Sequence, residues 1–201
     1  MVNKQHWLLI HLFSTLNHPI TIRKISLDLG IPYMTLSRMI HKLSQQGLIL
    51  LQKVGNYHTC QLNLKNPILK HHLIISSEEI TNEYLSKQSL ISILRKTILK
   101  YPFSTYTALL FGSYAKNKQE KHSDIDLAII SKNKTVLQKL KKEMSYLEKL
   151  YETEINILIF TPNQFREMLT SKEENVGKQI IKNNIILYNS ELFWEVVLNG
   201  I

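Results

Sequence analysis

The sequence predicts an α+β protein with two globular parts: a helical part that ends in a β-hairpin, and a later part in which helices and strands alternate. Three observations carry this prediction. Gly30 stands between two short amphipathic segments, Gly55-Asn56 separates two apolar runs, and residues 105–160 alternate between strand and helix patterns. The length of 201 residues suits one large or two small domains, either of which can bury a core. We expect two small domains.

The first part has the periodicity of three helices. An apolar stripe over residues 4–16 predicts the first helix, and Pro19 ends it because proline disfavours a helical residue before it. Thr21 can cap a second helix that Gly30 closes, and a third helix is expected at residues 33–46. The stripes consist of Trp7, Leu8, Ile10, His11, Leu12 and Leu16, then Ile22, Ile25 and Leu29, then Leu36, Ile40 and Leu43. Two short helices joined by a tight glycine turn predict a helix-turn-helix.

A β-hairpin with its tip at Gly55-Asn56 is expected after the third helix, in the position of a wing. We therefore predict a winged helix-turn-helix domain at residues 1–65. Residues 66–88 are expected to form a helical connector, in which Ser76-Ser77-Glu78-Glu79 acts as a capping box and opens a helix. A second domain is expected at residues 89–201.

Positive charge is concentrated in the first of these domains. Residues 1–65 contain seven Lys and Arg residues and one acidic residue, Asp28, so they carry +6 of the net charge of +9. A basic helix-turn-helix suits double-stranded DNA, with the third helix in the major groove and the wing near the phosphates. A protein-interaction or dimerisation module is the alternative. The expected DNA-binding residues are Tyr33, Thr35, Ser37, Arg38, His41, Lys42, Lys53 and Tyr57.

Cysteine content and hydropathy favour a cytoplasmic protein. Cys60 is the one cysteine, which excludes an internal disulfide and a cysteine-based zinc site. The apolar run at residues 7–13 is short and interrupted by His11, so it is expected to be a buried helix face. No run approaches the roughly 18 apolar residues of a membrane span, and we expect no membrane partner.

The second domain is predicted to be mixed α/β. In order along the chain, the sequence predicts a largely buried helix at 90–100, a strand at 105–111, a short helix from Ser113, a strand at 125–130, a helix at 135–151, a strand at 154–160 and a helix that starts at Thr161-Pro162.

The chemistry of this domain is expected at the ends of its first two strands. Asp124 and Asp126 are two apart on a β-pattern, so both carboxylates leave the same face. Two Mg²⁺ ions roughly 4 Å apart would remove their repulsion. Gly112 lets a phosphate approach the backbone, and Ser113 with the amides that follow it can hydrogen-bond a triphosphate.

The segment resembles the minimal nucleotidyltransferase branch of the DNA polymerase β superfamily. An apolar strand ending in Phe111 is followed by Gly112-Ser113, a spacer of ten residues and then Asp124-Ile125-Asp126. The resemblance covers residues 90–188 and implies a polymerase-β-like nucleotidyltransferase domain with a mixed sheet. It also implies Mg²⁺ and a nucleoside triphosphate, expected to be ATP, a hydroxyl that attacks the α-phosphate, and pyrophosphate as leaving group. The implied nucleotide-binding residues are Gly112, Ser113 and Tyr114, and Asp124 and Asp126 are the implied catalytic and metal-binding pair.

The third carboxylate of active members has no clear match. On the later strand, the residue between two apolar neighbours is Asn156, whose neutral amide adds no charge to a metal site. Glu154 lies two residues earlier and is the candidate substitute as a catalytic residue, although an exposed glutamate at a strand entrance fits equally well.

Two functions follow from this pattern. The favoured one is a DNA-binding transcriptional regulator whose second domain binds Mg²⁺ and a nucleoside triphosphate. The alternative is an active enzyme that transfers AMP to a protein hydroxyl, such as the antitoxin of a HEPN-type toxin, because the resemblance implies such partners. A homodimer is left open as the assembly.

Overall fold

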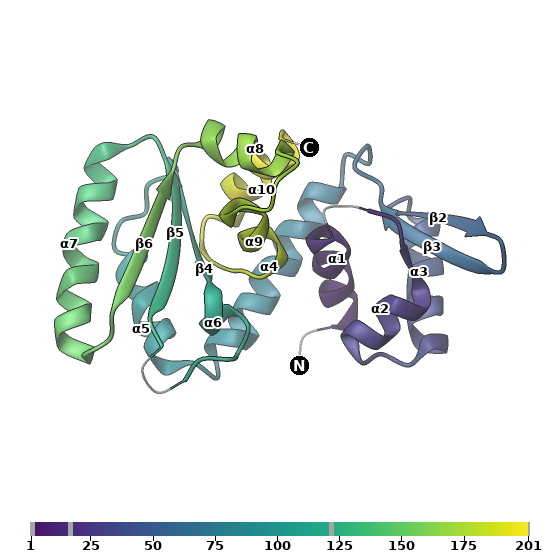
Figure 1. The fold of residues 1–201 in the computed structure, drawn as a ribbon, viewed down its shortest axis with the longest axis horizontal. Helices are drawn as coiled ribbons and strands as arrows, with labels where there is room; N and C mark the ends of the chain where they lie inside the picture. The colour runs from purple at the N-terminus through teal and green to yellow at the C-terminus, as the bar shows by residue number, and fades with distance from the viewer. Residues whose placement is uncertain (1–2, 16–17, 121–122, 201) are drawn as a thin grey trace. The chain divides into compact units, whose positions relative to one another are not determined.

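The computed structural model describes residues 3–15, 18–120 and 123–200. The chain divides into two compact units, residues 1–79 and 80–201, each shown as a ribbon in Figure 1. Helix α4 (Leu69–Leu85) contains the point of division.

In the described residues of the first unit, three helices and a three-stranded sheet precede α4. The elements are α1 (Lys4–Ser14), β1 (Ile20–Thr21), α2 (Ile22–Leu29), α3 (Tyr33–Gln45), β2 (Ile49–Val54) and β3 (Tyr57–Leu62). The strands are all antiparallel in the order β1-β3-β2, and Gly55-Asn56 forms the tip of the β2–β3 hairpin. The three helices and the hairpin expected from the sequence are confirmed.

Local signals fix the ends of α2. The Thr21 hydroxyl accepts a hydrogen bond from the Lys24 N–H at 3.2 Å, which satisfies one of the free donors at the helix start. Gly30 ends the helix with a φ of +61°, a conformation in which a side chain is strained. Both ends were therefore readable from residue type.

The buried face of α1 differs from the expected stripe. Leu8, Leu9, Leu12 and Phe13 are buried, whereas Trp7 is 40% exposed. The expectation was wrong for Trp7. Leu8 and Leu9, with Leu12 and Phe13 one turn later, form the buried face of the helix, and this turns the Trp7 indole outward. Leu16, also expected on the stripe, lies outside the described residues.

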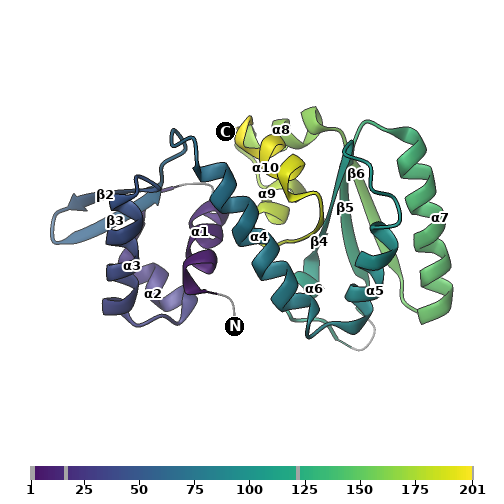
Figure 2. The same cartoon turned by 180° about the vertical axis from the view of Figure 1, so that it is seen from behind.

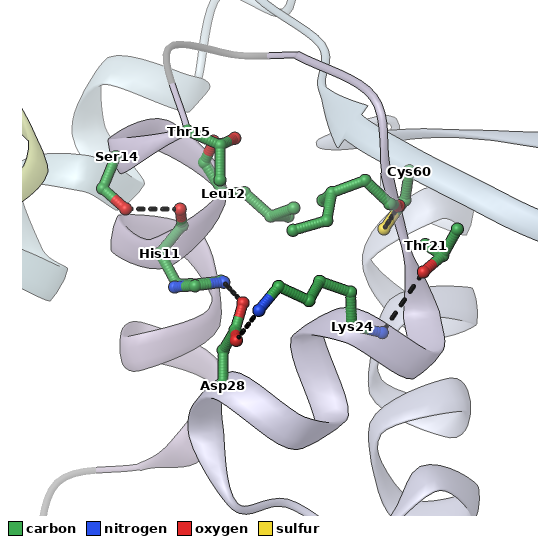
Figure 3. Close-up of polar contacts among 9 residues, drawn as sticks. His11, Leu12, Ser14, Thr15, Thr21, Lys24, Asp28 and Cys60 are labelled. Carbon is green, nitrogen blue, oxygen red and sulfur yellow. Dashed lines mark hydrogen bonds and ion pairs between the residues drawn. The ribbon is translucent and has the colours of Figure 1, made fainter.

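A polar cluster joins α1 to α2 (Figure 3). His11 Nε2 lies 3.4 Å from Asp28 Oδ2, and Lys24 Nζ lies 2.6 Å from Asp28 Oδ1. Burial lowers the pKa of His11, and the charge of Asp28 opposes that shift only partly. The imidazole is therefore held in its neutral form near pH 7.

The expected capping box at Ser76 is wrong. Ser76 and Ser77 are buried inside α4, where the Ser77 hydroxyl donates to the Leu73 carbonyl at 2.8 Å. The helix begins earlier, at Leu69, just after a turn in which the Asn66 side chain accepts from the Ile68 N–H at 3.0 Å. Apolar residues four apart then bury the helix from Leu69 onward.

The second unit is a four-stranded mixed sheet with helices on both sides. Its elements after α4 are α5 (Ser89–Ile98), β4 (Tyr106–Phe111), α6 (Gly112–Ala115), β5 (Ile125–Ser131), α7 (Lys134–Tyr151), β6 (Ile155–Phe160), α8 (Pro162–Thr170), α9 (Val176–Lys182), β7 (Ile185–Tyr188) and α10 (Ser190–Leu198). The strand order is β6-β5-β4-β7, in which β5 and β6 are parallel and the other pairs antiparallel. The strands lie between α7 on one side and α8, α9 and α10 on the other (Figures 1 and 2). The mixed α/β prediction is confirmed.

Helix α5 is amphipathic, which corrects the expectation of a largely buried helix. Ile91, Leu94 and Ile98 are buried, but Leu99 is 45% exposed. The helix thus needs one apolar face only, and its other face meets solvent. The expected helix start at Thr161-Pro162 is confirmed: Thr161 caps α8 as part of a capping box with Gln164, and Pro162 lies in the first turn.

Candidate nucleotide site

The site is built where β4 ends beside the start of β5. Phe111, the last residue of β4, pairs with Asp126 in antiparallel register. The next residue, Gly112, has a φ of +71°, and a Cβ at this position would overlap the Asp126 carboxylate. Glycine is therefore required here for backbone conformation and for the close approach of Asp126. The sequence alone indicates only the approach of a phosphate at Gly112.

Asp124, Asp126 and Asn156 come together at the neighbouring strand ends. Asp126 is opposite Asn156 in the parallel β5–β6 pair, and the Asn156 amide donates to Asp124 Oδ2 at 3.5 Å. Burial raises the pKa of Asp126, and the nearby charge of Asp124 raises it further, while hydrogen bonding from Asn156 opposes both effects. The pair is thus a partly desolvated anionic site with a neutral amide donor beside it.

Glu154 lies at the edge of this group. It precedes the first residue of β6, which corrects the expected strand start, and its carbonyl accepts from the Ile125 N–H at 2.9 Å. Its exposed side chain does not complete a metal site, since no three Asp, Glu, His or Cys residues in the described part of the chain are grouped to hold one ion. A role for Glu154 as third ligand would require its side chain to move.

The turn after Gly112 is a single four-residue helix, α6. Ser113 is half-buried, and its carbonyl accepts from the N–H groups of Lys116 and Lys118. The Tyr114 carbonyl accepts from the Asn117 N–H at 3.0 Å and from the Tyr84 hydroxyl at 2.9 Å. Sequence analysis missed Tyr84, because the contact joins residues 30 apart and no local pattern reports it.

The oxygen-rich donor set fits a hard divalent cation. Asp124 and Asp126 supply anionic oxygens, and Asn156 can supply a neutral one if its amide turns its oxygen inward. A cation there would offset the repulsion and desolvation that raise the pKa of Asp126. These residues could therefore hold Mg²⁺, with fewer charges than three carboxylates would give.

A separate surface in the first unit carries the residues expected to bind DNA. Seven of the eight expected side chains are exposed, and Ser37 is half-buried. Tyr33, at the start of α3, and Tyr57, at the hairpin tip, line one hollow of about 610 Å³ together with Arg23 and Asn56. Sequence analysis missed Arg23, although its place in the first turn of α2 was a usable signal.

Comparison with known proteins concerns the second unit. Residues 94–192 match the family model described as Polymerase beta, Nucleotidyltransferase. No curated protein matches the chain. Among the described residues, no helix is long and apolar enough to cross a membrane. The matched segment includes Gly112-Ser113, both aspartates and Asn156, so residues 94–192 are similar to the nucleotidyltransferases of the polymerase β family.

Proposed function

We propose that this protein is a DNA-binding regulator whose nucleotidyltransferase domain binds Mg²⁺ and a nucleoside triphosphate but transfers the nucleotide slowly or not at all. The observation that carries the proposal is the position of Asn156 opposite Asp126 and beside Asp124. Two carboxylates support metal and nucleotide binding, and the neutral third position disfavours rapid transfer.

Binding would rest on two sets of groups. Asp124 and Asp126 hold Mg²⁺, which when bound neutralises the charge of the triphosphate. Gly112 leaves its backbone open to a phosphate, and Ser113 together with the Tyr114 N–H donates hydrogen bonds to phosphate oxygens. ATP is the proposed nucleotide.

Transfer would need an attacking hydroxyl that loses its proton readily. An anionic third ligand strengthens the hold on the metal that acidifies this hydroxyl, and Asn156 lacks that charge. A Lewis-acid contribution of several kcal/mol is typical, so its loss corresponds to roughly a hundredfold slower transfer or more. Tight binding with slow transfer suits a domain that senses a nucleotide.

An active transferase is the second candidate. Its supporting observation is the hydrogen bond from the Ile125 N–H to the Glu154 carbonyl, which fixes the Glu154 backbone next to Asp124. If the Glu154 side chain turns inward, a third carboxylate is restored, and AMP transfer to a hydroxyl of a partner protein, such as a HEPN-type toxin, becomes feasible.

DNA binding is proposed for residues 1–65 as a winged helix-turn-helix. Support comes from α3, which buries Leu36, Ile40 and Leu43 and presents Arg38 and Lys42 to solvent. The hollow between α2, α3 and the hairpin tip offers Arg23 beside Tyr33, a suitable place for a DNA backbone. Thr35, Ser37 and His41 on α3, and Lys53 and Tyr57 on the hairpin, complete the proposed surface.

The experiment that tests this function separates regulator from enzyme. Purified protein is incubated with Mg²⁺ and ATP labelled at the α-phosphate, alone and with the product of the adjacent gene, and its binding to upstream DNA is measured in parallel. A regulator binds the DNA with little label transferred. Strong labelling of a partner that is lost in Glu154→Gln, with no DNA binding, would establish the enzyme instead.

A further inference from the structure

We infer that Tyr84, in the last turn of α4, is a positioning residue of the nucleotide site and fixes α6 through its hydroxyl. The inference rests on the proposed nucleotide binding at Gly112-Ser113. Tyr84 lies outside the matched segment 94–192, so it adds a residue that the family match does not supply.

The contact itself is short and partly buried. Tyr84 is 7% exposed, and its hydroxyl donates to the Tyr114 carbonyl at 2.9 Å. Burial, together with the neighbouring Tyr114, raises the pKa of Tyr84 to about 12, so the hydroxyl keeps its proton and remains a donor across the physiological range. The hydroxyl is therefore a hydrogen-bond donor under the conditions in which a nucleotide would bind.

Helix α6 needs such an anchor because it is only one turn long. Four residues form too short a helix to be stable alone, so its position depends on tertiary contacts. Its first residue, Gly112, packs against Asp126, while the bond from Tyr84 holds the carbonyl of the third residue, Tyr114. Ser113, between these two contacts, is thereby held in place.

The end of α4, which carries Tyr84, is itself held by hydrogen bonds. One turn earlier, the Thr81 hydroxyl donates to the Ile186 carbonyl of β7 at 3.1 Å, and Ile80 is buried. The Asn82 side chain accepts from the Arg95 guanidinium at 3.1 Å. The end of α4 is thus hydrogen-bonded to the sheet and to α5, so the Tyr84 side chain is held in place where it contacts α6.

A matched pair of variants tests the role. Tyr84→Phe removes only the hydroxyl, and Tyr106→Phe removes a more deeply buried one in the same domain. The Tyr106 hydroxyl donates to the Ile98 and Tyr101 carbonyls at 3.0 Å each, at the opposite end of β4 from Gly112. Both variants should lower the unfolding temperature, since each loses a buried hydrogen bond.

Calorimetric titration with ATP and Mg²⁺ gives the distinguishing readout. Tyr84→Phe should bind ATP about fivefold more weakly, the equivalent of one net hydrogen bond, whereas Tyr106→Phe should bind as the wild type does. Binding of Mn²⁺ alone, which needs Asp124 and Asp126 rather than α6, should be equal in all three proteins. Amide exchange at residues 113–118 should be faster in Tyr84→Phe only.

Three results would overturn the inference. Equal ATP affinity and equal amide exchange in Tyr84→Phe and wild type would show that α6 does not depend on the hydroxyl. Equal weakening in both variants would reduce the effect to general loss of stability. If wild type fails to bind ATP at all while Mn²⁺ still binds, the proposed nucleotide binding fails and this inference fails with it.

Discussion

Replacing Asn156 with aspartate should make the domain less stable without metal and more responsive to metal. The Asn156 amide lies 3.5 Å from Asp124 Oδ2 and is paired in register with Asp126. Asn156→Asp replaces the amide donor with a third carboxylate, at about the same distance from Asp124 Oδ2. Because Asp124 and Asn156 are exposed, a dielectric near that of water applies, and the repulsion from Asp124 alone is about 1 kcal/mol.

This destabilisation can be measured by thermal unfolding. About 1 kcal/mol corresponds to a decrease of about 4 °C in the unfolding temperature of a domain of this size. Adding Mg²⁺ should restore the loss, since the cation offsets the repulsion, and the variant should gain more from Mg²⁺ than wild type does. Transfer from labelled ATP should also increase.

Asn183→Asp is the matched control, because it adds the same charge at an exposed position just after α9. It should leave the response to Mg²⁺ unchanged. If Asn156→Asp unfolds at the wild-type temperature and gains no more from Mg²⁺ than the control, the reasoning about Asn156 and the two carboxylates is refuted.

Three further predictions concern single sites. Asp126→Asn should raise the unfolding temperature of the metal-free protein, because burial raises the pKa of Asp126 and its carboxylate destabilises the fold at neutral pH; an unfolding temperature below that of wild type would contradict this. Arg38→Ala with Lys42→Ala should weaken binding to upstream DNA and flatten its dependence on salt, and an unchanged salt slope in gel-shift titrations would remove α3 from the interface. Burial lowers the pKa of His11 below 6.5, so the contribution of the neutral imidazole to stability is fully present above pH 6.5 and is lost as the pH falls through the lowered value. Urea unfolding of His11→Phe should therefore be less sensitive to acid than that of wild type. Equal sensitivity would contradict the assignment.

The helical elements of the first unit were predictable because their ends depend on local chemistry. Thr21 and Gly30 mark the two ends of α2 by capping and by a left-handed conformation, both of which follow from residue type. The start of α4 was not predictable in the same way. Ser76 and Ser77 look like a cap in sequence, but burial of the apolar face through Leu73 and Ile80 carries the helix past them.

The elements after α8 were missed for a related reason. Strand β7 (Ile185–Tyr188) has four residues and pairs with β4 across an irregularity between Ala108 and Leu109. A strand this short has little periodicity of its own. Whether these residues form a strand depends on their pairing with β4 at the edge of the sheet, and the sequence does not reveal that pairing. The same applies to the short helix α9.

The candidate site was predictable where it depends on adjacent residues. Gly112-Ser113 and Asp124-Ile125-Asp126 are contiguous motifs, whereas the position of Asn156 relative to Asp126 depends on the parallel register of β5 and β6. Alternation along the strand leaves Glu154 and Asn156 both open; in the structure Asn156 is opposite Asp126, and Glu154 precedes the strand, which begins at Ile155. Tyr84 was missed because tertiary packing alone brings it to its site.

The central claim is that Asp124 and Asp126 hold Mg²⁺ and a nucleoside triphosphate, and calorimetric titration of ATP tests it most directly. Wild type is titrated with ATP in the presence of Mg²⁺ and again in the presence of a chelator, beside Asp124→Asn with Asp126→Asn. Wild type should bind ATP only when Mg²⁺ is present, and the double variant should not bind ATP. Equal ATP affinity of the two proteins in Mg²⁺ would contradict it.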